Sequence, residues 1–419
     1  MKQPNQIPKE QLKQQRLEVH LKVRKEKKRK KRMTYSTLLF AMLLILFVTS
    51  LRVSPTFASY VAKIPGFTPI VELIAFDRGL EDVVKHDYFE EIGESVTSPE
   101  NNITVTVVGV AADFTGMSIA YTVEAPFELS QYLLSDIKIL QAGEPIPAGF
   151  SYNFTNSEGE KYIEDLIQLT NSEGMDYTNR DFALELTFKG THKGTITVPF
   201  SIQQEIKQPK VLAENIELVF QNQKITLEKV TVSPLRASIS VRLDENNTMQ
   251  VLSLDDIKLI DETGEEWASI KNGISANGSA RDQAFTMYMQ SNYFHEPKTL
   301  TLQIGSIAAL PKGEDTIKVD LKNKKVLYMP PQVDWDISFE QNQLIVEGEN
   351  PTEFTRQMLL WARDENGEDV PDIQRTFEDH FDSHFKENVY FKDGITSPIT
   401  IDIAYFPNFI GENIEVPLK

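Results

Sequence analysis

The sequence predicts a mainly β chain, with one N-terminal transmembrane helix and a short helical collar followed by two or three tandem immunoglobulin-like antiparallel β-sandwich domains. Three observations carry this prediction. The 19-residue stretch Met33–Leu51 contains no charged side chain. From residue 101 onward, apolar and polar residues alternate with a period of two, which is typical of half-buried strands. Blocks of this pattern recur about 120 residues apart, which indicates tandem domains.

Met33–Leu51 is long enough to span a membrane, because a helix of this length rises about 28 Å and a bilayer's hydrocarbon core is about 30 Å thick. The preceding segment, Lys22–Arg32, is basic except at Val23 and Glu26. Basic flanks stay in the cytoplasm, so we predict a single-pass cell-membrane protein in the lipid bilayer, with a cytoplasmic N-terminus and an extracellular C-terminus. The predicted topogenic flank consists of Lys27, Lys28, Arg29, Lys30, Lys31 and Arg32.

A cleavable signal peptide is the alternative interpretation of this stretch. The unbroken apolar run Leu38–Val48 has 11 residues, and Thr56-Phe57-Ala58 resembles a cleavage site. The long segment that precedes the run, and Arg52 shortly after it, favour an uncleaved anchor.

Charge is divided unevenly along the 419 residues. Residues 1–32 hold 13 basic and 3 acidic side chains, and the remainder holds 30 basic and 58 acidic ones. Such an acidic remainder repels nucleic acid, so no nucleic-acid partner is expected. The chain has no cysteine, which excludes disulfides and thiol chemistry, and the length suggests two to four domains held by core packing.

Residues 1–32 form the predicted basic cytoplasmic tail, which is too short to bury a core of its own. Its apolar residues Leu12, Leu17 and Leu21 are the predicted contacts for a cytoplasmic partner, because charge alone gives poor specificity. Residues 33–51 are the predicted transmembrane helix.

Residues 52–96 are the predicted helical juxtamembrane collar. Pro65-Gly66 indicates a turn, and Thr68 can cap a helix that has Pro69 in its first position. Gly79 is expected to end this helix, and a second short apolar stripe follows it. The two apolar stripes consist of Ile70, Val71 and Ile74, and of Leu80, Val83 and Val84.

Three blocks in this region, RVSPTFASYVAKIPG (52–66), IVELI (70–74) and DRGL (77–80), resemble a family of Gram-positive single-pass membrane proteins. Members of that family carry an extracellular domain of unknown function just after the anchor, and the resemblance is close from Arg52 to about Val123. Some members are described as anti-sigma factors, negative effectors of extracytoplasmic-function sigma factors. The resemblance therefore implies a cytoplasmic sigma factor as the partner of the tail.

Four pairs of matching blocks define the repeat, at offsets of 120 to 122 residues. They are ITVTVVGV (103–110) with ITLEKVTV (225–232), SIAYTVE (118–124) with SISVRLD (238–244), DIKIL (136–140) with DIKLI (256–260), and TITVPF (195–200) with TIKVDL (316–321). We therefore predict one immunoglobulin-like β-sandwich over 97–205 and a second over 206–329. Pro330-Pro331 marks the next junction. TIDI and NIEVPLK (400–403, 413–419) echo earlier blocks, so 330–419 is predicted as a smaller third β-domain.

Two segments resemble metal sites. Asp364–Asp369 carries oxygen ligands as a calcium loop does, but its Asn366-Gly367 is a strong hairpin signal, and we favour a turn. His380 and His384 would share one face of a helix, but no further ligand accompanies them, so a solvated polar segment is favoured. We therefore predict no metal, no cofactor and no catalytic residue set, and do not expect an enzyme.

Together these features predict a membrane-anchored envelope sensor or regulator. Its sandwiches would bind an unidentified extracellular ligand or wall component, and its tail would act on a sigma factor. The alternative is a structural or adhesive cell-envelope protein whose tail only sets topology. A catalytic outer part ranks third.

Overall fold

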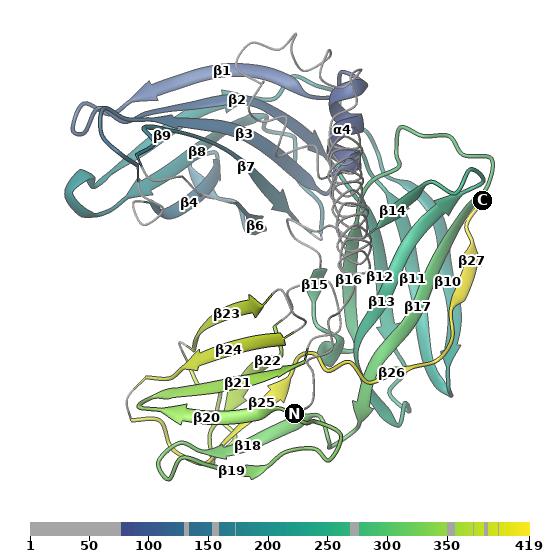
Figure 1. The fold of residues 1–419 in the computed structure, drawn as a ribbon. Helices are drawn as coiled ribbons and strands as arrows, with labels where there is room; N and C mark the ends of the chain where they lie inside the picture. The colour runs from purple at the N-terminus through teal and green to yellow at the C-terminus, as the bar shows by residue number, and fades with distance from the viewer. Residues whose placement is uncertain are drawn as a thin grey trace, which may run out of the picture. The chain divides into compact units, whose positions relative to one another are not determined.

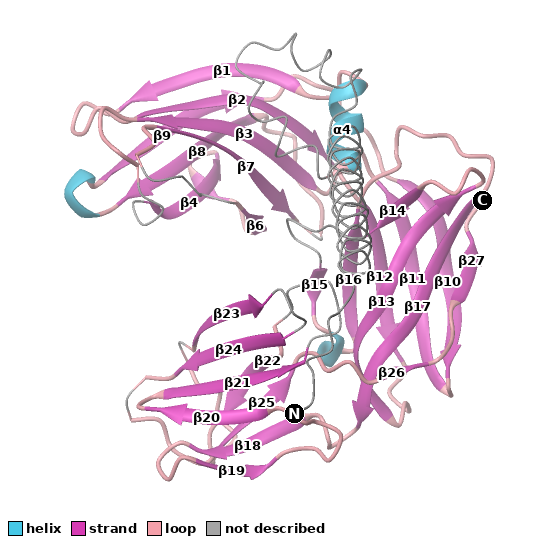
Figure 2. Ribbon diagram, in the orientation of Figure 1, coloured by secondary structure: helices cyan, strands magenta, loops and turns pink. Residues whose placement is uncertain are grey.

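The computed structural model describes residues 77–419 except 130–133, 153–158, 172, 269–275, 350–356, 372, 381–383 and 393. The chain divides into two compact units, Met1–Tyr60 and Val61–Lys419, and the described residues all belong to the second. Figures 1 and 2 show that strands dominate this unit. The described helices are α4 (Arg78–Lys85) and two short 3-10 turns, η1 (Gly190–His192) and η2 (Ala280–Asp282).

The predicted transmembrane architecture is contradicted. In the part of the chain that the structure describes, no helix combines the length and the apolar character needed to cross a membrane. Among the described residues the α-helix is α4, which has eight residues and is about 12 Å long, against about 30 Å of hydrocarbon. The tail 1–32 and the predicted span 33–51 lie outside the described residues. The prediction is corrected to a mainly β fold with one short α-helix in the residues that the structure describes, and the single-pass location is not supported.

The predicted collar needs a second correction where it is described. Gly79 does not end a helix but lies in the first turn of α4, which Asp77 caps. Glu90–Thr97 form a strand rather than a helix, because the alternation of Ile92 and Val96 with polar residues fits an edge strand over a core. Leu80, Val83 and Val84 are buried on one helix face, as their spacing predicts.

The first sandwich is made of two antiparallel sheets. One sheet has the order β1 (Glu90–Thr97), β2 (Thr104–Asp113), β3 (Gly116–Glu124), β7 (Tyr162–Thr170) and β6 (Gly149–Ser151). The other has the order β5 (Glu144–Pro145), β4 (Leu134–Gln141), β8 (Asp181–Phe188) and β9 (Gly194–Ser201).

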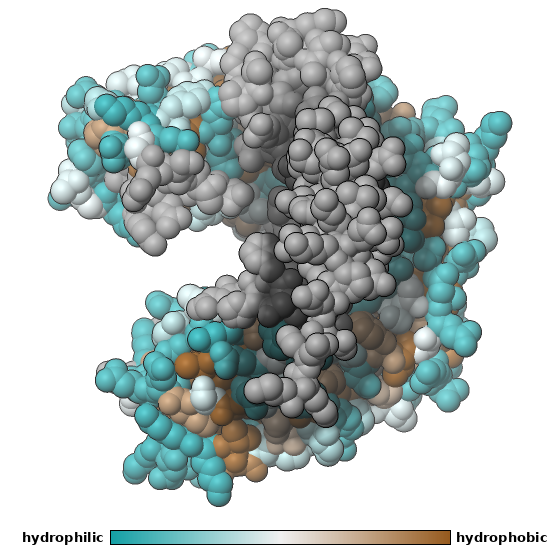
Figure 3. All heavy atoms as spheres, viewed as in Figure 1, coloured by the Kyte–Doolittle hydropathy of each residue, from teal (hydrophilic) through white to brown (hydrophobic). Residues whose placement is uncertain are grey.

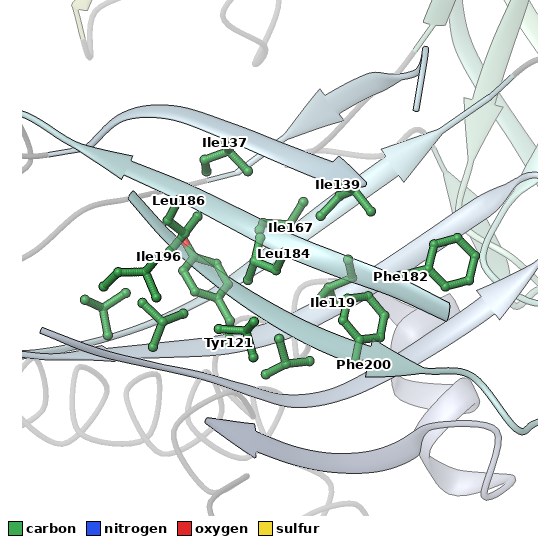
Figure 4. Packing of buried hydrophobic residues seen from close by; sticks show 14 of the residues in the cluster. Ile119, Tyr121, Ile137, Ile139, Ile167, Phe182, Leu184, Leu186, Ile196 and Phe200 are labelled. Carbon is green, nitrogen blue, oxygen red and sulfur yellow. The ribbon is translucent and has the colours of Figure 1, made fainter. Parts of the chain in front are cut away.

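Alternating side chains of these two sheets form the core, as Figure 4 shows. Along β8 every second side chain is buried, and Leu184 and Leu186 are fully enclosed. From the facing sheet, Ile119 and Tyr121 pack into the same cluster. The alternation that predicted these strands is therefore the alternation that builds the core.

The second sandwich repeats this plan. One sheet has the order β10 (Lys210–Phe220), β11 (Gln223–Val232), β12 (Ala237–Leu243), β16 (Ala284–Met289) and β15 (Ala276–Gly278). The other has the order β14 (Glu266–Ala268), β13 (Met249–Asp261), β17 (Leu300–Pro311) and β26 (Phe409–Ile410), with β27 (Ile414–Pro417) also paired to β17.

The third sandwich is formed by strands that lie between β17 and β26 in the sequence. Its sheets have the orders β19 (Lys325–Tyr328), β18 (Thr316–Asp320), β25 (Ile399–Ile403), β22 (Leu359–Arg363), and β20 (Asp336–Glu340), β21 (Gln343–Glu349), β24 (His384–Tyr390), β23 (Gln374–His380). Its core contains Trp335 and Phe385. Figure 3 shows apolar side chains gathered on the visible face of this sandwich, whereas hydrophilic ones predominate on the first.

The closing strands of the second and third sandwiches are exchanged. In the first sandwich β9 follows β8 and pairs with it, and the repeat assigns TIKVDL (316–321) the same place beside β17. Instead β18 pairs with β25 of the third sandwich, and β27 returns from the end of the chain to pair with β17 (Figure 1).

This exchange corrects the predicted limits 206–329 and 330–419 at two strands. Its physical cause is the end of β17, where Ile307 and Ala309 pack in the second core while Ala308 and Leu310 pack in the third. The chain therefore leaves β17 beside the third core, where Ile317 and Val319 are then buried.

Val416→Asp is expected to destabilise the second sandwich although it lies near the C-terminus. Val416 is 5% exposed and its backbone pairs with Leu302 in β17, so a carboxylate there would be buried without a partner. We expect a loss of about 3 kcal/mol in the free energy of unfolding, measured by urea denaturation.

The control is Glu415→Gln, which changes an exposed side chain of the same strand. Hydrogen exchange followed by mass spectrometry locates the effect. Faster hydrogen exchange in β17 agrees with the pairing of β27 to β17. Faster hydrogen exchange confined to β25 contradicts this pairing.

Candidate functional site

The helix α4 is the element around which the candidate site is built. Asp77 caps it, accepting hydrogen bonds from the Gly79 and Leu80 backbone N–H groups at 2.8 and 3.3 Å. An ion pair of 2.7 Å between Glu81 and Lys85 supports its exposed face. These local signals explain why an eight-residue segment forms a helix here, although most of its stability must come from packing.

One side of α4 contacts the second sandwich. The Asp82 carboxylate lies 2.6 Å from Nε2 of His295, and the Arg78 guanidinium lies 3.0 Å from the Glu265 carboxylate. The hydrogen bond that the Asp82 carboxylate accepts from His295 raises the pKa of His295. A Cβ atom on Gly79 would lie 2.7 Å from the backbone nitrogen of Ser291, so only glycine allows this close approach.

The chain just after α4 contacts the first sandwich. The Tyr88 hydroxyl lies 2.8 Å from the Ala112 carbonyl and 3.1 Å from that of Glu205, and it accepts a hydrogen bond from Lys207 N at 3.1 Å. Burial raises the pKa of Tyr88 to about 12. The Tyr88 ring also packs at a tilt on Phe294 of the second sandwich, with 5.7 Å between ring centroids. The segment 77–88 therefore touches both sandwiches.

A buried charged contact joins the first two sandwiches directly beneath this segment. Asp113 ends β2 and accepts a hydrogen bond from Leu235 N of the second sandwich at 2.8 Å. Arg236, 3% exposed, donates to the Thr170 hydroxyl of the first sandwich and lies with its guanidinium carbon 5.5 Å from the centroid of the Tyr288 ring. We call Asp113, Leu235, Arg236 and Thr170 the arginine junction.

Electrostatics explain why the charges of the arginine junction depend on one another. Burial raises the pKa of Asp113 and lowers that of Arg236, and the attraction between the two groups opposes both shifts. Asp77, also buried, has a pKa raised to about 6 by burial, although the helix N–H groups and Arg236 lower it. For Asp113 and Arg236 the attraction of the other group is the largest stabilising contribution, so removing one of the two leaves its partner uncompensated.

A second arginine joins the second sandwich to the third. Arg281 of η2 donates to the Asp315 carboxylate at 2.8 Å and to the Ile403 carbonyl at 3.1 Å. Asp402 lies 3.6 Å from Arg281 and 2.5 Å from Arg363. The second sandwich thus supplies one arginine to each neighbour.

One further buried carboxyl lies in the third sandwich. Glu387, 1% exposed, accepts hydrogen bonds from the backbone N–H groups of Met358 and Leu359 at 2.8 and 3.2 Å. Arg375 lies 3.6 Å from it. Burial raises the pKa of Glu387 to about 7, against the lowering effect of these neighbours.

The two segments that resembled metal sites are strand hairpins. The Asp364 carboxylate accepts hydrogen bonds from Asn366 N and Glu368 N, and Gly367 adopts a φ of 81°, so the segment is a turn. His380 of β23 is paired in register with His384 of β24, so the two residues do not lie on a helix. Within the described ranges, no group of three or more histidine or acidic side chains is placed to hold a metal ion.

The predicted partner residues of the tail, Leu12, Leu17 and Leu21, lie outside the described residues, as do Lys27–Arg32. They remain predictions. Sequence reasoning missed Asp113 and Arg236, because a charged residue in a hairpin turn looks like a solvated one. The repeat itself held a signal: the two residues lie in equivalent turns, 113–116 and 233–236, of successive repeats.

Comparison with known proteins identifies two domains of unknown function. Residues 27–125 match a domain of unknown function (DUF4179), and residues 209–339 match a family of unknown function (DUF5643). The first match agrees with the resemblance over Arg52–Val123, and neither description names an anti-sigma factor.

A solved structure, described as that of a conserved domain protein from Bacillus anthracis, is similar at 16% identity and a TM-score of 0.38. The similarity covers 57% of this chain and 84% of that chain, and we base no argument on it. A comparison with curated proteins finds no match.

Arg236→Met is expected to destabilise the chain by about 3 to 5 kcal/mol, because it leaves the buried Asp113 without its compensating charge. Urea denaturation measures the loss. The matched control is Arg242→Met, whose 59% exposed side chain pairs with Glu228 at the surface and should contribute less than about 1 kcal/mol.

The double variant Arg236→Met with Asp113→Asn should recover part of the loss, since no unpaired buried charge remains. Equal losses for the double and the single variant would show that the two charges do not compensate each other.

Glu387→Gln is expected to change how stability depends on pH. The folded-state pKa of Glu387, about 7, lies above its ordinary value of 4.5, so the folded chain holds the proton more tightly. The contribution of Glu387 is therefore complete below about pH 4.5 and is lost as pH rises to about 7, by at most about 3 kcal/mol.

Denaturation at pH 4.5, 6 and 7.5 measures this slope. It should be shallower in Glu387→Gln and unchanged in the control Glu365→Gln, which alters an exposed turn residue. An unaltered slope in Glu387→Gln is the contrary result.

Proposed function

We propose that this protein is a non-catalytic regulator whose β-sandwiches bind a ligand and whose N-terminal tail binds a partner protein. One observation carries the proposal: the segment 77–88, which contains α4, contacts the first sandwich through Tyr88 and the second through Asp82. Sandwich repeats serve as binding modules more often than as enzymes, which supports the non-catalytic part by analogy.

The arginine junction provides a route for coupling. A ligand that favours a different packing of the first two sandwiches must rearrange Asp113 and Arg236, and Asp77 of the α4 cap interacts with the same arginine. Any such rearrangement changes the surroundings of α4 and of the chain that leads into it. The ligand can shift this equilibrium only by its difference in affinity for the two packings.

The proposed partner of the tail is an extracytoplasmic-function sigma factor. The resemblance over Arg52–Val123 supports this class of partner, and the match over 27–125 covers the same region. A basic segment of 32 residues has to fold on its partner, so its affinity must come from apolar anchors as well as from charge.

The tail is tested by isothermal titration of the full chain with an extracytoplasmic-function sigma factor from the same organism. Replacing Leu12, Leu17 and Leu21 by Ala should weaken binding at least about a hundredfold, because three buried leucine side chains are lost. The control replaces Gln11, Gln14 and Gln15 by Ala and should bind as the native chain does. Equal binding by the two triple variants, or none by the native chain, would falsify the proposed partner.

A structural or adhesive role is the second candidate, and the two arginine contacts favour it. Arg236 and Arg281 tie the second sandwich to both neighbours, as expected of a stiff array. Arg236→Met separates the two candidate functions. If the arginine junction couples ligand binding to the tail, the variant should have a changed affinity for the sigma factor. If the junction is only structural, the variant should have lower stability and unchanged affinity.

A further inference from the structure

The first sandwich has an open side, where the free edges of its two sheets lie next to each other. β1 pairs only with β2, and β9 pairs only with β8, among the described strands. A cleft of about 460 Å³ lies between these two edges. We call it the open-edge cleft.

The open-edge cleft combines an apolar floor with an acidic rim. Ile92 and Phe200 belong to the edge of the core and line the floor. Glu91 and Glu94 lie exposed on β1, and neither carboxylate forms an ion pair or hydrogen bond in the described part of the chain. No lysine or arginine lines the cleft.

The other two acidic groups of the rim have structural roles. Glu90 accepts hydrogen bonds from Gln203 N and Gln204 N at 2.9 to 3.0 Å, which closes one end of the cleft. Asp181 accepts a hydrogen bond from Ser201 at 2.5 Å across β8 and β9. Glu91 and Glu94 are therefore the two rim carboxylates available to a ligand.

Of the two edges, β1 is the one that can accept another strand. Pro199 interrupts β9 and has no N–H group to donate. β1 contains no proline, and its bulge between Glu91 and Glu94 leaves the stretch 94–97 in regular pairing with β2. A strand that pairs with this stretch and continues past the bulge would run beside Glu94 and then Glu91, with every second side chain on the same face of the sheet.

We propose that the open-edge cleft binds an extended basic peptide, which adds to β1 as a strand and directs lysine or arginine side chains to Glu91 and Glu94. Charge complementarity identifies the occupant, since residues 90–202 hold 17 acidic and five basic side chains. The aliphatic stems of lysine and arginine suit a floor of Ile92 and Phe200. This inference concerns the first sandwich alone and does not depend on the proposed partner of the tail.

The test titrates the full chain with a dye-labelled hexapeptide of alternating lysine and valine, read by fluorescence anisotropy. Binding should weaken when salt rises from 50 to 300 mM, because screening shortens the range of the charges. A peptide of alternating glutamate and valine should not bind, and one of alternating serine and valine should bind at least about tenfold more weakly. Equal binding of the three peptides overturns the proposal.

Variants locate the site. Glu91→Gln with Glu94→Gln should weaken binding of the lysine peptide about tenfold. The matched control, Glu128→Gln with Glu173→Gln, removes two exposed charges elsewhere in the same sandwich and should leave binding unchanged. All four positions are exposed, so circular dichroism melts should stay the same. Equal affinity in the two variants overturns the proposal.

Hydrogen exchange tests the binding mode. The peptide should slow exchange of amides in β1, and protection elsewhere without protection of β1 overturns it. Two other occupants give distinct results. First, β1 could be protected in the peptide-free chain, and this protection could disappear when Lys27–Arg32 are changed to Gln. That result assigns the cleft to the chain's own basic segment. Protection that grows with protein concentration assigns it to a second copy.

Discussion

The placement of α4 and of the first two sandwiches depends on one buried electrostatic contact, between the turn that ends β2 and Arg236. A guanidinium that is 3% exposed has lost most of its hydration, and the neighbours that replace it include Thr170, the Leu169 carbonyl, the Tyr288 ring and the charges of Asp113 and Asp77. Such contacts add little net stability compared with apolar packing. A misaligned arrangement, however, leaves a buried charge without its partner and is strongly destabilised. The junction thus specifies one arrangement, and the apolar cores supply most of the stability of each sandwich.

Much of the β architecture was predictable because the alternation of residues reports directly on burial. Ile103, Val105 and Val107 alternate in the sequence and are all fully buried. The spacing of the repeated blocks likewise predicted two successive sandwiches, and both cores contain residues from those blocks. The hairpin at Asp364 follows from turn chemistry that acts within four residues, so a local pattern was sufficient.

What the sequence did not predict depends on contacts between distant residues. The pairing of β18 with β25 depends on where β17 ends relative to the second and third cores. No local sequence pattern indicates this position. Arg236 lies in a turn next to Pro234 and Leu235, where charge normally points to solvent, and only the neighbouring sandwich buries it. The transmembrane helix was predicted from hydropathy alone. Among the described residues the only α-helix is α4, which has eight residues. The open-edge cleft arises from two edges that are about 100 residues apart along the chain.

The exchange of β18 and β27 has a consequence for biosynthesis. During translation, β17 leaves the ribosome roughly 100 residues before β27, which covers its edge in the finished protein. At about 5 to 20 residues per second, this edge and the apolar side chains that Val416 covers stay open for roughly 5 to 20 seconds. The third sandwich is synthesised within this interval, so the second is completed only after it. Nascent chains of this protein therefore pass through a stage at which a strand of another molecule can occupy the place of β27.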